Sequence, residues 1–164
     1  MSRAPGRVLA IVGPGEGASL EAIAAAERLA ELAARGGWVV SCGGRNAGVM
    51  AAAARGAARG GGLSVGLLPG SDTAEASPEL SIALPTGLGE ARNAVLAQSC
   101  GAMAACGMNA GTAAEVALAL KAGKRVVLVR PEPAALQLAQ ALAPDRVLTA
   151  GSADEAWTLL TTSS

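Results

Sequence analysis

Four glycine-rich segments contain most of the residues that could bind a ligand. Their sequences are GPGEGAS at 13–19, CGGRNAG at 42–48, TGLGEARN at 86–93 and GMNAGT at 107–112. Each stands where a helix is expected to begin, and a helix N-terminus offers unpaired N–H groups and a partial positive charge. A phosphate gains hydrogen bonds there without a lysine. Glycine is also the ordinary residue of tight turns, but four such segments together favour a phosphate-binding site.

The residues expected to contact a phosphate-bearing small molecule lie in these segments. They are Gly13, Gly15, Gly17, Gly43, Gly44, Arg45, Asn46, Gly48, Arg92, Asn109, Gly111 and Thr112. The Arg45 guanidinium suits paired oxygen atoms, with a solvated loop arginine as the alternative. Arg92 falls in the first turn of a helix, where a cation is unfavourable, so we expect an anionic partner, either Glu115 or a ligand. The Asn109 side chain is expected to contact the ring system of the ligand.

Glu115 has two interpretations. Residues 112–115 match a capping box, in which Thr112 caps the helix and the Glu115 carboxylate returns to the N–H of the cap. The same carboxylate would also face a ligand lying over the turn, where it could bind a hydroxyl group or act as a base. The sequence leaves both interpretations open.

Several kinds of chemistry are disfavoured by what the sequence lacks. It contains neither G-x-G-x-x-G nor G-x-x-x-x-G-K-[ST], which disfavours a standard dinucleotide or ATP-hydrolysing site. It contains no histidine, which excludes a Ser-His-Asp or Cys-His mechanism and a histidine metal site. Its three cysteines have no C-x-x-C spacing, so we expect reduced, structural thiols and no metal site. A contact between Cys42 or Cys106 and the ligand stays open.

Composition and charge indicate a soluble protein. The 164 residues fit one domain, 1–164. The 13 basic and 13 acidic residues are scattered, which is not typical of nucleic-acid binding. The apolar stretch near the N-terminus is too short for a signal peptide, and no run approaches the ~20 apolar residues of a membrane span. We therefore expect a cytoplasmic protein with neither a nucleic-acid nor a membrane partner.

Hydrophobic patterns predict an alternation of strands and helices. Strands are expected at 7–12, 38–41, 63–68, 81–84, 102–106, 125–129 and 147–149. Helices are expected from Ser19 to the glycines at 36–37, at 49–59, from the turn after 86 to 99, at 112–122, at 134–143 and at the C-terminus. Residues 69–79 read as a polar loop. The fold class is α/β: a doubly wound, Rossmann-like parallel sheet with helices on both faces and ligands at the carboxyl ends of the strands.

The helix that begins near Thr112 is apolar almost all round. Its sequence AAEVALAL lacks the wet face of a surface helix. One side is expected to meet the sheet and another to meet a second subunit, which predicts a homo-oligomer. A central helix covered within its own subunit is the alternative.

Longer motifs carry a resemblance to a known superfamily. The segment CGGRNAGVM resembles the S-G-G-x-x-x-G-x-M element of the LONELY GUY, or lysine-decarboxylase-like, Rossmann proteins, and GMNAGTAAE stands where they have P-G-G-x-G-T-x-x-E. Within that superfamily, GMNAGTAAEVALALKAGKRVVLV, VGLLPGSDTAE and PTGLGEARN are most similar to the molybdenum cofactor carrier proteins. The resemblance covers nearly the whole chain.

This resemblance implies a carrier. It implies a homotetramer that binds, protects and delivers the molybdenum cofactor (molybdopterin), with donor or acceptor proteins as partners. A carrier needs a binding surface but no turnover, which agrees with the absence of histidine.

Two other functions stay open. The alternative within the superfamily is a nucleoside 5′-monophosphate phosphoribohydrolase, for which the resemblance implies Arg92 and Glu115 as catalytic residues. However, the P-G-G portion is Gly107-Met108-Asn109 here, and Asn93 stands where a lysine usually follows the arginine. A regulatory nucleotide sensor would show the same turns.

Overall fold

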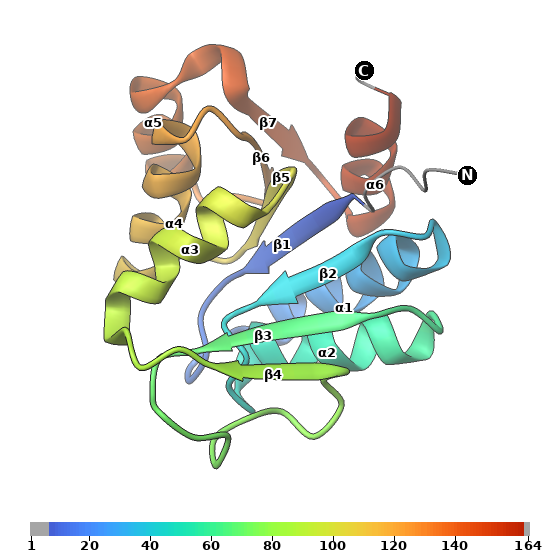
Figure 1. Cartoon of the computed structure of the whole chain (residues 1–164). Coiled ribbons are helices and arrows are strands. Elements are labelled where there is room, and N and C mark those ends of the chain that lie inside the picture. Colours follow the sequence, from blue (N-terminus) through green and yellow to red (C-terminus); the bar gives the residue numbers. More distant parts are fainter. Residues whose placement is uncertain (1–6, 163–164) are drawn as a thin grey trace, which may run out of the picture.

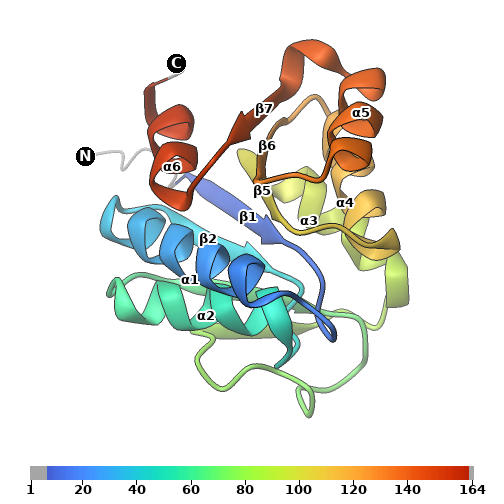
Figure 2. The same ribbon diagram turned by 180° about the vertical axis from the view of Figure 1, so that it is seen from behind.

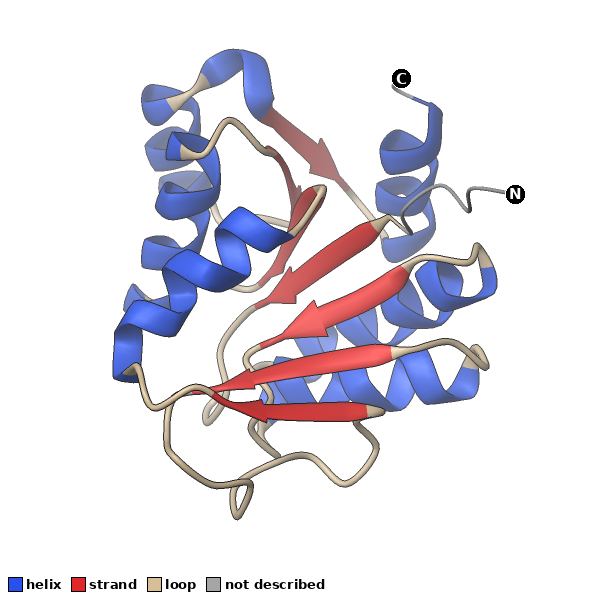
Figure 3. Ribbon diagram, in the orientation of Figure 1, coloured by secondary structure: helices blue, strands red, loops and turns tan. Residues whose placement is uncertain are grey.

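The computed structural model describes residues 7–162 and contains seven strands and six α-helices there (Figures 1 and 3). Strands and helices alternate in this range except between the third and fourth strands, which no helix separates. The strands are β1 Val8–Val12, β2 Val39–Cys42, β3 Ser64–Leu68, β4 Ile82–Pro85, β5 Ala102–Cys106, β6 Arg125–Val129 and β7 Val147–Ala150. The helices are α1 Leu20–Arg35, α2 Gly48–Arg59, α3 Arg92–Ser99, α4 Ala110–Lys121, α5 Pro133–Leu142 and α6 Ala153–Thr162. Short 3-10 turns, η1 Gly89–Ala91 and η2 Pro144–Arg146, precede α3 and β7.

All strands belong to one parallel sheet in the order β4-β3-β2-β1-β5-β6-β7. Helices α1, α2 and α6 cover one face, and α3, α4 and α5 cover the other, as the two opposite views show (Figures 1 and 2). The order reverses between β1 and β5, which is the place where a doubly wound sheet opens a crevice at its carboxyl edge. The expected α/β, doubly wound fold is confirmed.

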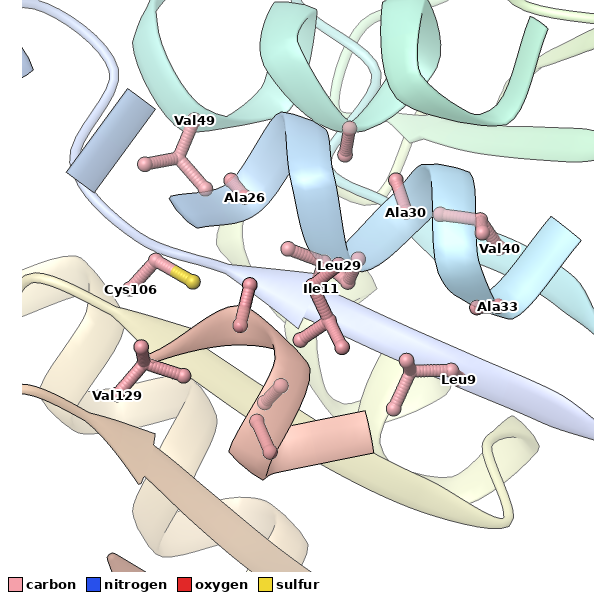
Figure 4. Close-up of a cluster of buried hydrophobic side chains, with 14 of the residues drawn as sticks. Leu9, Ile11, Ala26, Leu29, Ala30, Ala33, Val40, Val49, Cys106 and Val129 are labelled. Atoms are coloured by element: carbon pink, nitrogen blue, oxygen red, sulfur yellow. The ribbon is translucent and has the colours of Figure 1, made fainter. Parts of the chain in front are cut away.

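The core is built from small aliphatic residues. Along β1, Leu9 and Ile11 point to the α1 and α2 side, where Figure 4 shows Ile11 beside Leu29 of α1. Ala10 and Val12 point to the opposite core. Helices α1 and α2 approach so closely that a Cβ atom on Gly56 would lie 2.0 Å from the Glu27 carbonyl oxygen. The alanine and glycine of these helices therefore set the distance between them.

The expected element boundaries hold to within about one residue except at α4. This helix begins at Ala110 with Asn109 as its N-cap, two residues before the expected start. The polar loop 69–79 folds back onto the turn after β2, where Arg45 and Ala76 form an antiparallel bridge. Within residues 7–162, no helix combines the length and apolar character needed to cross a membrane. Residues 1–6, part of the expectation about a signal peptide, lie outside the described range.

Candidate ligand-binding site

A polar cavity of about 300 Å³ opens at the carboxyl edge of the sheet, beside the point where the strand order reverses. Turns after β1, β2 and β5 meet there with the start of α3. The lining residues are Gly13, Gly15, Glu16, Arg45, Met50, Glu90, Arg92, Asn93, Asn109, Gly111, Thr112 and Glu115. The structure therefore brings parts of all four glycine-rich segments together around one space.

Eight residues singled out from the sequence line this cavity. They are Gly13, Gly15, Arg45, Arg92, Asn109, Gly111, Thr112 and Glu115. Five others do not: Gly17, Gly43, Gly44, Asn46 and Gly48. Gly17 is exposed in the turn before α1, and the exposed Asn46 donates its backbone N–H to the Glu75 carbonyl.

The remaining glycines, Gly43, Gly44 and Gly48, approach other parts of the protein. A Cβ atom on Gly48 would lie 2.0 Å from the Gly15 carbonyl oxygen, and the φ angle of Gly48 is +48°. Gly44, with a φ of +82°, lies against the backbone of Gly66 in β3. Glycine at these positions lets turns and strands pack on one another. The backbone here therefore comes close to other parts of the protein, whereas the sequence suggested that it would come close to a ligand.

The N-terminus of α4 supplies hydrogen-bond donors to the cavity. Asn109 is its N-cap, and its Oδ1 atom accepts from the Thr112 backbone N–H and hydroxyl, both at 2.9 Å. In the described part of the chain, the N–H groups of Ala110 and Gly111 have no hydrogen-bond acceptor. Two unpaired N–H groups at a helix N-terminus are a suitable place for an anion.

Of the two interpretations of Glu115, the capping box with Thr112 is wrong. Asn109 caps α4 instead, which places Thr112 inside the first turn. The Glu115 carboxylate is then one turn further along the helix and lines the cavity. Because Asn109 uses its Oδ1 atom for the cap, only its amide nitrogen is left for the expected contact with a ring.

Arg92 is buried, and its partners within the protein are backbone carbonyls. Its Nη1 atom donates to the carbonyl oxygens of Gly43 and Leu67. No ion pair joins Arg92 to Glu115 within residues 7–162, and its Nε atom is buried without an acceptor. Arg92 therefore ties the turn after β2 to the end of β3, while its charge stays next to the cavity. The expectation of Glu115 as a direct partner is not met.

Arg45 lies at the rim, between two carboxylates. Its Nη2 atom is 3.7 Å from Glu16 Oε1, and its Nε atom is 3.5 Å from Glu75 Oε2. The Arg45 side chain is 37% exposed and both glutamates are more exposed, so these pairs are weak. An anion at the rim can replace them at small cost.

Glu115 is the buried carboxylate of the cavity. Its burial raises the pKa from 4.5 to about 7, with the Arg92 charge acting in the opposite direction and Glu90 in the same one. Glu90 is exposed and accepts a hydrogen bond from the Asn93 side chain at 3.2 Å. The Oδ1 atom of Asn93 is buried without a partner. Raised carboxyl pKa values and unpaired buried polar atoms gather at functional sites.

Four lining residues were missed from the sequence: Glu16, Met50, Glu90 and Asn93. Three of them, Glu16, Glu90 and Asn93, stand inside the glycine-rich segments. Their place in these segments could therefore have marked them as lining residues. Met50 occupies the last position of CGGRNAGVM, where it fills the space beside Gly43 and Gly15.

The cysteines do not reach this cavity. Cys42 and Cys106 are fully buried, and Cys42 lies 3.7 Å from the Met50 carbonyl oxygen. Burial raises the pKa of the Cys42 thiol to about 11 and that of Cys106 to about 12. All three cysteines are free, as expected of structural thiols.

A smaller cavity of about 140 Å³ lies beyond Gly107 and Met108, toward Arg130. Arg130 pairs there with the exposed Glu21 at 3.4 Å. This cavity contains no buried charged residue, whereas the larger one contains Arg92 and Glu115. The larger cavity is therefore the candidate site.

Fold and site together define a Rossmann-like ligand-binding protein with its cavity at the topological switch point. Residues 7–157 match the model of the SLOG cluster4 family. An uncharacterised protein of Archaeoglobus fulgidus is 40% identical over 124 residues, 75% of this chain and 80% of that protein. The chain belongs to the SLOG cluster4 family.

Solved structures agree with this assignment. The molybdenum cofactor binding protein of the phototrophic bacterium Rippkaea orientalis is 39% identical, with a TM-score of 0.92, over 94% of this chain and 95% of that one. The Moco carrier protein of Chlamydomonas reinhardtii is 38% identical, with a TM-score of 0.89, over 94% and 95% of the two chains. This chain is therefore similar to molybdenum cofactor carriers along nearly its whole length.

Proposed function

We propose that this protein binds, protects and delivers a molybdopterin-type cofactor and needs no turnover to do so. The observation that carries the proposal is 38–39% identity to two molybdenum cofactor proteins across 94% of the chain. The polar cavity gives that similarity a physical basis, because it offers hydrogen-bond donors for a phosphate and acceptors for a ring.

The residues of the cavity fit such a cofactor in two parts. The unpaired N–H groups of Ala110 and Gly111, with Arg45 nearby at the rim, suit its terminal phosphate. The Asn93 and Glu90 side chains suit the nitrogen-bound hydrogens of a pterin ring. The unpaired atoms Arg92 Nε and Asn93 Oδ1 lie at the same end, where a small rearrangement on binding would give them partners.

Phosphoribohydrolase activity is the second candidate. The observation in its favour is that Arg92 and Glu115 line one cavity and that the pKa of Glu115 is about 7, as a general acid requires. Against it, Arg92 holds two backbone carbonyls, and Asn109 of the altered loop serves as a helix cap. We therefore prefer the carrier.

Identification of the bound ligand tests the proposal. Mass spectrometry of the purified protein should find a molybdopterin-type compound, and protein incubated with the cofactor should retain it. Incubation with AMP should release no adenine. Steady adenine release that disappears in Glu115→Ala would instead establish the hydrolase.

We further propose a homotetramer that works in the cytoplasm with cofactor donor or acceptor proteins. Exposed apolar side chains support an oligomer: Ile82 and Leu84 on the edge strand β4, and Leu88 and Val95 before and within α3. Light scattering after gel filtration measures the mass, and a monomer would refute the assembly.

A further inference from the structure

The position of Glu115 raises a question that cofactor binding alone does not answer. It is 9% exposed and lies on α4, in a cavity proposed to receive an anion. Placing an ionised carboxylate there opposes an anionic ligand, because like charges at close range in a poorly solvated site repel strongly. A buried glutamate in such a place needs a way to avoid carrying its charge.

No nearby cation removes the problem. The other charged residues that line the cavity are Glu16 before α1, Arg45 after β2, and Glu90 and Arg92 at the start of α3, and Glu75 pairs with Arg45 from outside the lining. The negative charge of Glu115 also raises the pKa of the buried Cys42 thiol. Arg92 directs Nη1 to two carbonyl oxygens, and no ion pair links it to Glu115 within the described range.

The charges of the lining residues balance only when Glu115 is neutral. Two arginines then face the two exposed carboxylates of Glu16 and Glu90. With Glu115 ionised, the cavity carries one net negative charge before any ligand arrives. An anion that enters it therefore favours the protonated form of Glu115.

We propose that Glu115 is a ligand-binding residue that takes up a proton from solvent when an anionic group binds in this cavity. The O–H bond formed on its carboxyl group removes the repulsion and provides a hydrogen-bond donor. On release the proton returns to solvent, so ligand retention weakens as the pH rises. This inference rests on the proposed function and names a regulation of the same site.

The neighbourhood of Glu115 sets the pH range. Its pKa of about 7 makes the free site half protonated near neutral pH. A bound anion raises this value further, since a nearby negative charge disfavours the ionised carboxylate. Affinity and protonation are linked, so each unit by which the ligand raises the pKa corresponds to about a tenfold difference in affinity between low and high pH.

Inorganic sulfate is a suitable probe, because its charge is constant around neutral pH while that of a phosphate monoester changes near pH 6. Carbon NMR of the glutamate carboxyl groups follows Glu115 directly in the wild-type protein, and Glu115→Gln identifies its resonance. We expect the Glu115 carboxyl group to titrate with a midpoint near neutral pH, and we expect sulfate to raise that midpoint. A midpoint that sulfate leaves unchanged would overturn the proposal.

The sulfate affinity provides the second measurement, followed through the Gly111 amide resonance at about pH 6 and about pH 8. We expect roughly three- to tenfold weaker binding at the higher pH in the wild-type protein. This pH dependence of the sulfate affinity should vanish in Glu115→Gln. It should persist in Glu132→Gln, a matched change at an exposed glutamate outside this cavity. The proposal would be contradicted if sulfate did not bind at either pH or bound independently of pH. It would also be contradicted if the affinity of Glu115→Gln changed with pH as much as that of the wild-type protein.

Sulfate carries no pterin, so this result is separable from the proposed function. A protein that shows proton-linked sulfate binding but retains no molybdenum cofactor would refute the carrier and leave the role of Glu115 intact. Cofactor retention without pH-dependent sulfate binding would support the carrier and refute the role of Glu115.

Discussion

The turns after β2 and after β5 are both rich in glycine and both lead into a helix, yet their glycines approach different groups. In the turn after β2, Gly44 and Gly48 lie against the backbones of β3 and of the turn after β1. In the turn after β5, a Cβ atom on Gly111 would meet nothing closer than the Asn109 side chain at 3.5 Å, and Gly111 borders the cavity. Gly44 and Gly48 therefore serve the fold, whereas Gly111 leaves space for a ligand.

The helix starts also differ, although less sharply. At α2, Ala47 offers no side-chain cap, and the Val49 N–H donates to the Pro14 carbonyl at 3.0 Å, within the protein. At α4, the N–H groups of Ala110 and Gly111 have no acceptor in the described range, and Gly111 lines the cavity. The start of α4 is therefore the better ligand site, because its unpaired N–H groups lie at the cavity.

The largest effect is expected for alanine at Gly48. Its Cβ atom would lie 2.0 Å and 2.4 Å from the carbonyl oxygens of Gly15 and Pro14, and its positive φ adds strain. We expect Gly48→Ala to lower the free energy of unfolding by at least roughly 3 kcal/mol.

The matched change in the other turn is Gly111→Ala, which meets no close atom and adds a better helix former. It should keep or raise stability by up to about 1 kcal/mol. Urea unfolding compares the two variants. Equal losses would remove the distinction between the turns.

A smaller loss is expected for Arg92→Ala, since it leaves the Gly43 and Leu67 carbonyls without their donor. We expect about 2–4 kcal/mol less stability. Arg45→Ala, a loop arginine with exposed partners, should change stability by less than about 0.5 kcal/mol. Thermal unfolding distinguishes them, and a stable Arg92→Ala variant would mean that the turn after β2 holds its shape unaided.

The next largest effect is a pH-dependent gain in the stability of the Glu115→Gln variant. In the wild-type protein the raised pKa of Glu115 means that the folded state keeps a proton that the unfolded state loses, so stability falls from about pH 4.5 to about pH 7. The substitution should stabilise by up to roughly 3 kcal/mol at pH 8 and have little effect below pH 4.5. Urea unfolding across this range measures it; a constant difference would contradict the raised pKa.

The smallest effect is expected in binding alone. Arg45→Ala should weaken binding of a phosphate-bearing ligand by roughly 1–3 kcal/mol with the fold intact. Calorimetry with the molybdenum cofactor or another phosphate-bearing ligand measures the difference. Unchanged affinity would assign Arg45 to its ion pairs with Glu16 and Glu75 only.

The sequence predicted the fold well because apolar periodicity and glycine punctuation agree along the chain. Strands β5 and β6 were predicted to the residue, since both faces of each are buried. The start of α4 was predicted late, because Asn109 and Thr112 are both good N-caps and only the three-dimensional turn decides between them.

The site was harder to predict than the fold. Sequence shows which residues can approach a ligand, but contacts between turns decide which ones do: Gly48 meets the turn after β1, and Arg92 turns to two carbonyls. Glu90 and Asn93 were not predicted as binding residues, because an exposed carboxylate or an amide side chain gains significance only from the cavity beside it.

Cofactor retention tests the central claim most directly. The purified protein is mixed with the molybdenum cofactor, separated from free ligand by gel filtration, and measured for molybdenum and pterin together. We predict retention by the wild-type protein and by Gly70→Ala, whose added methyl group meets open space, and a clear loss in Arg45→Ala. No retention by the wild-type protein, or equal retention by all three, would contradict a cofactor held in this cavity.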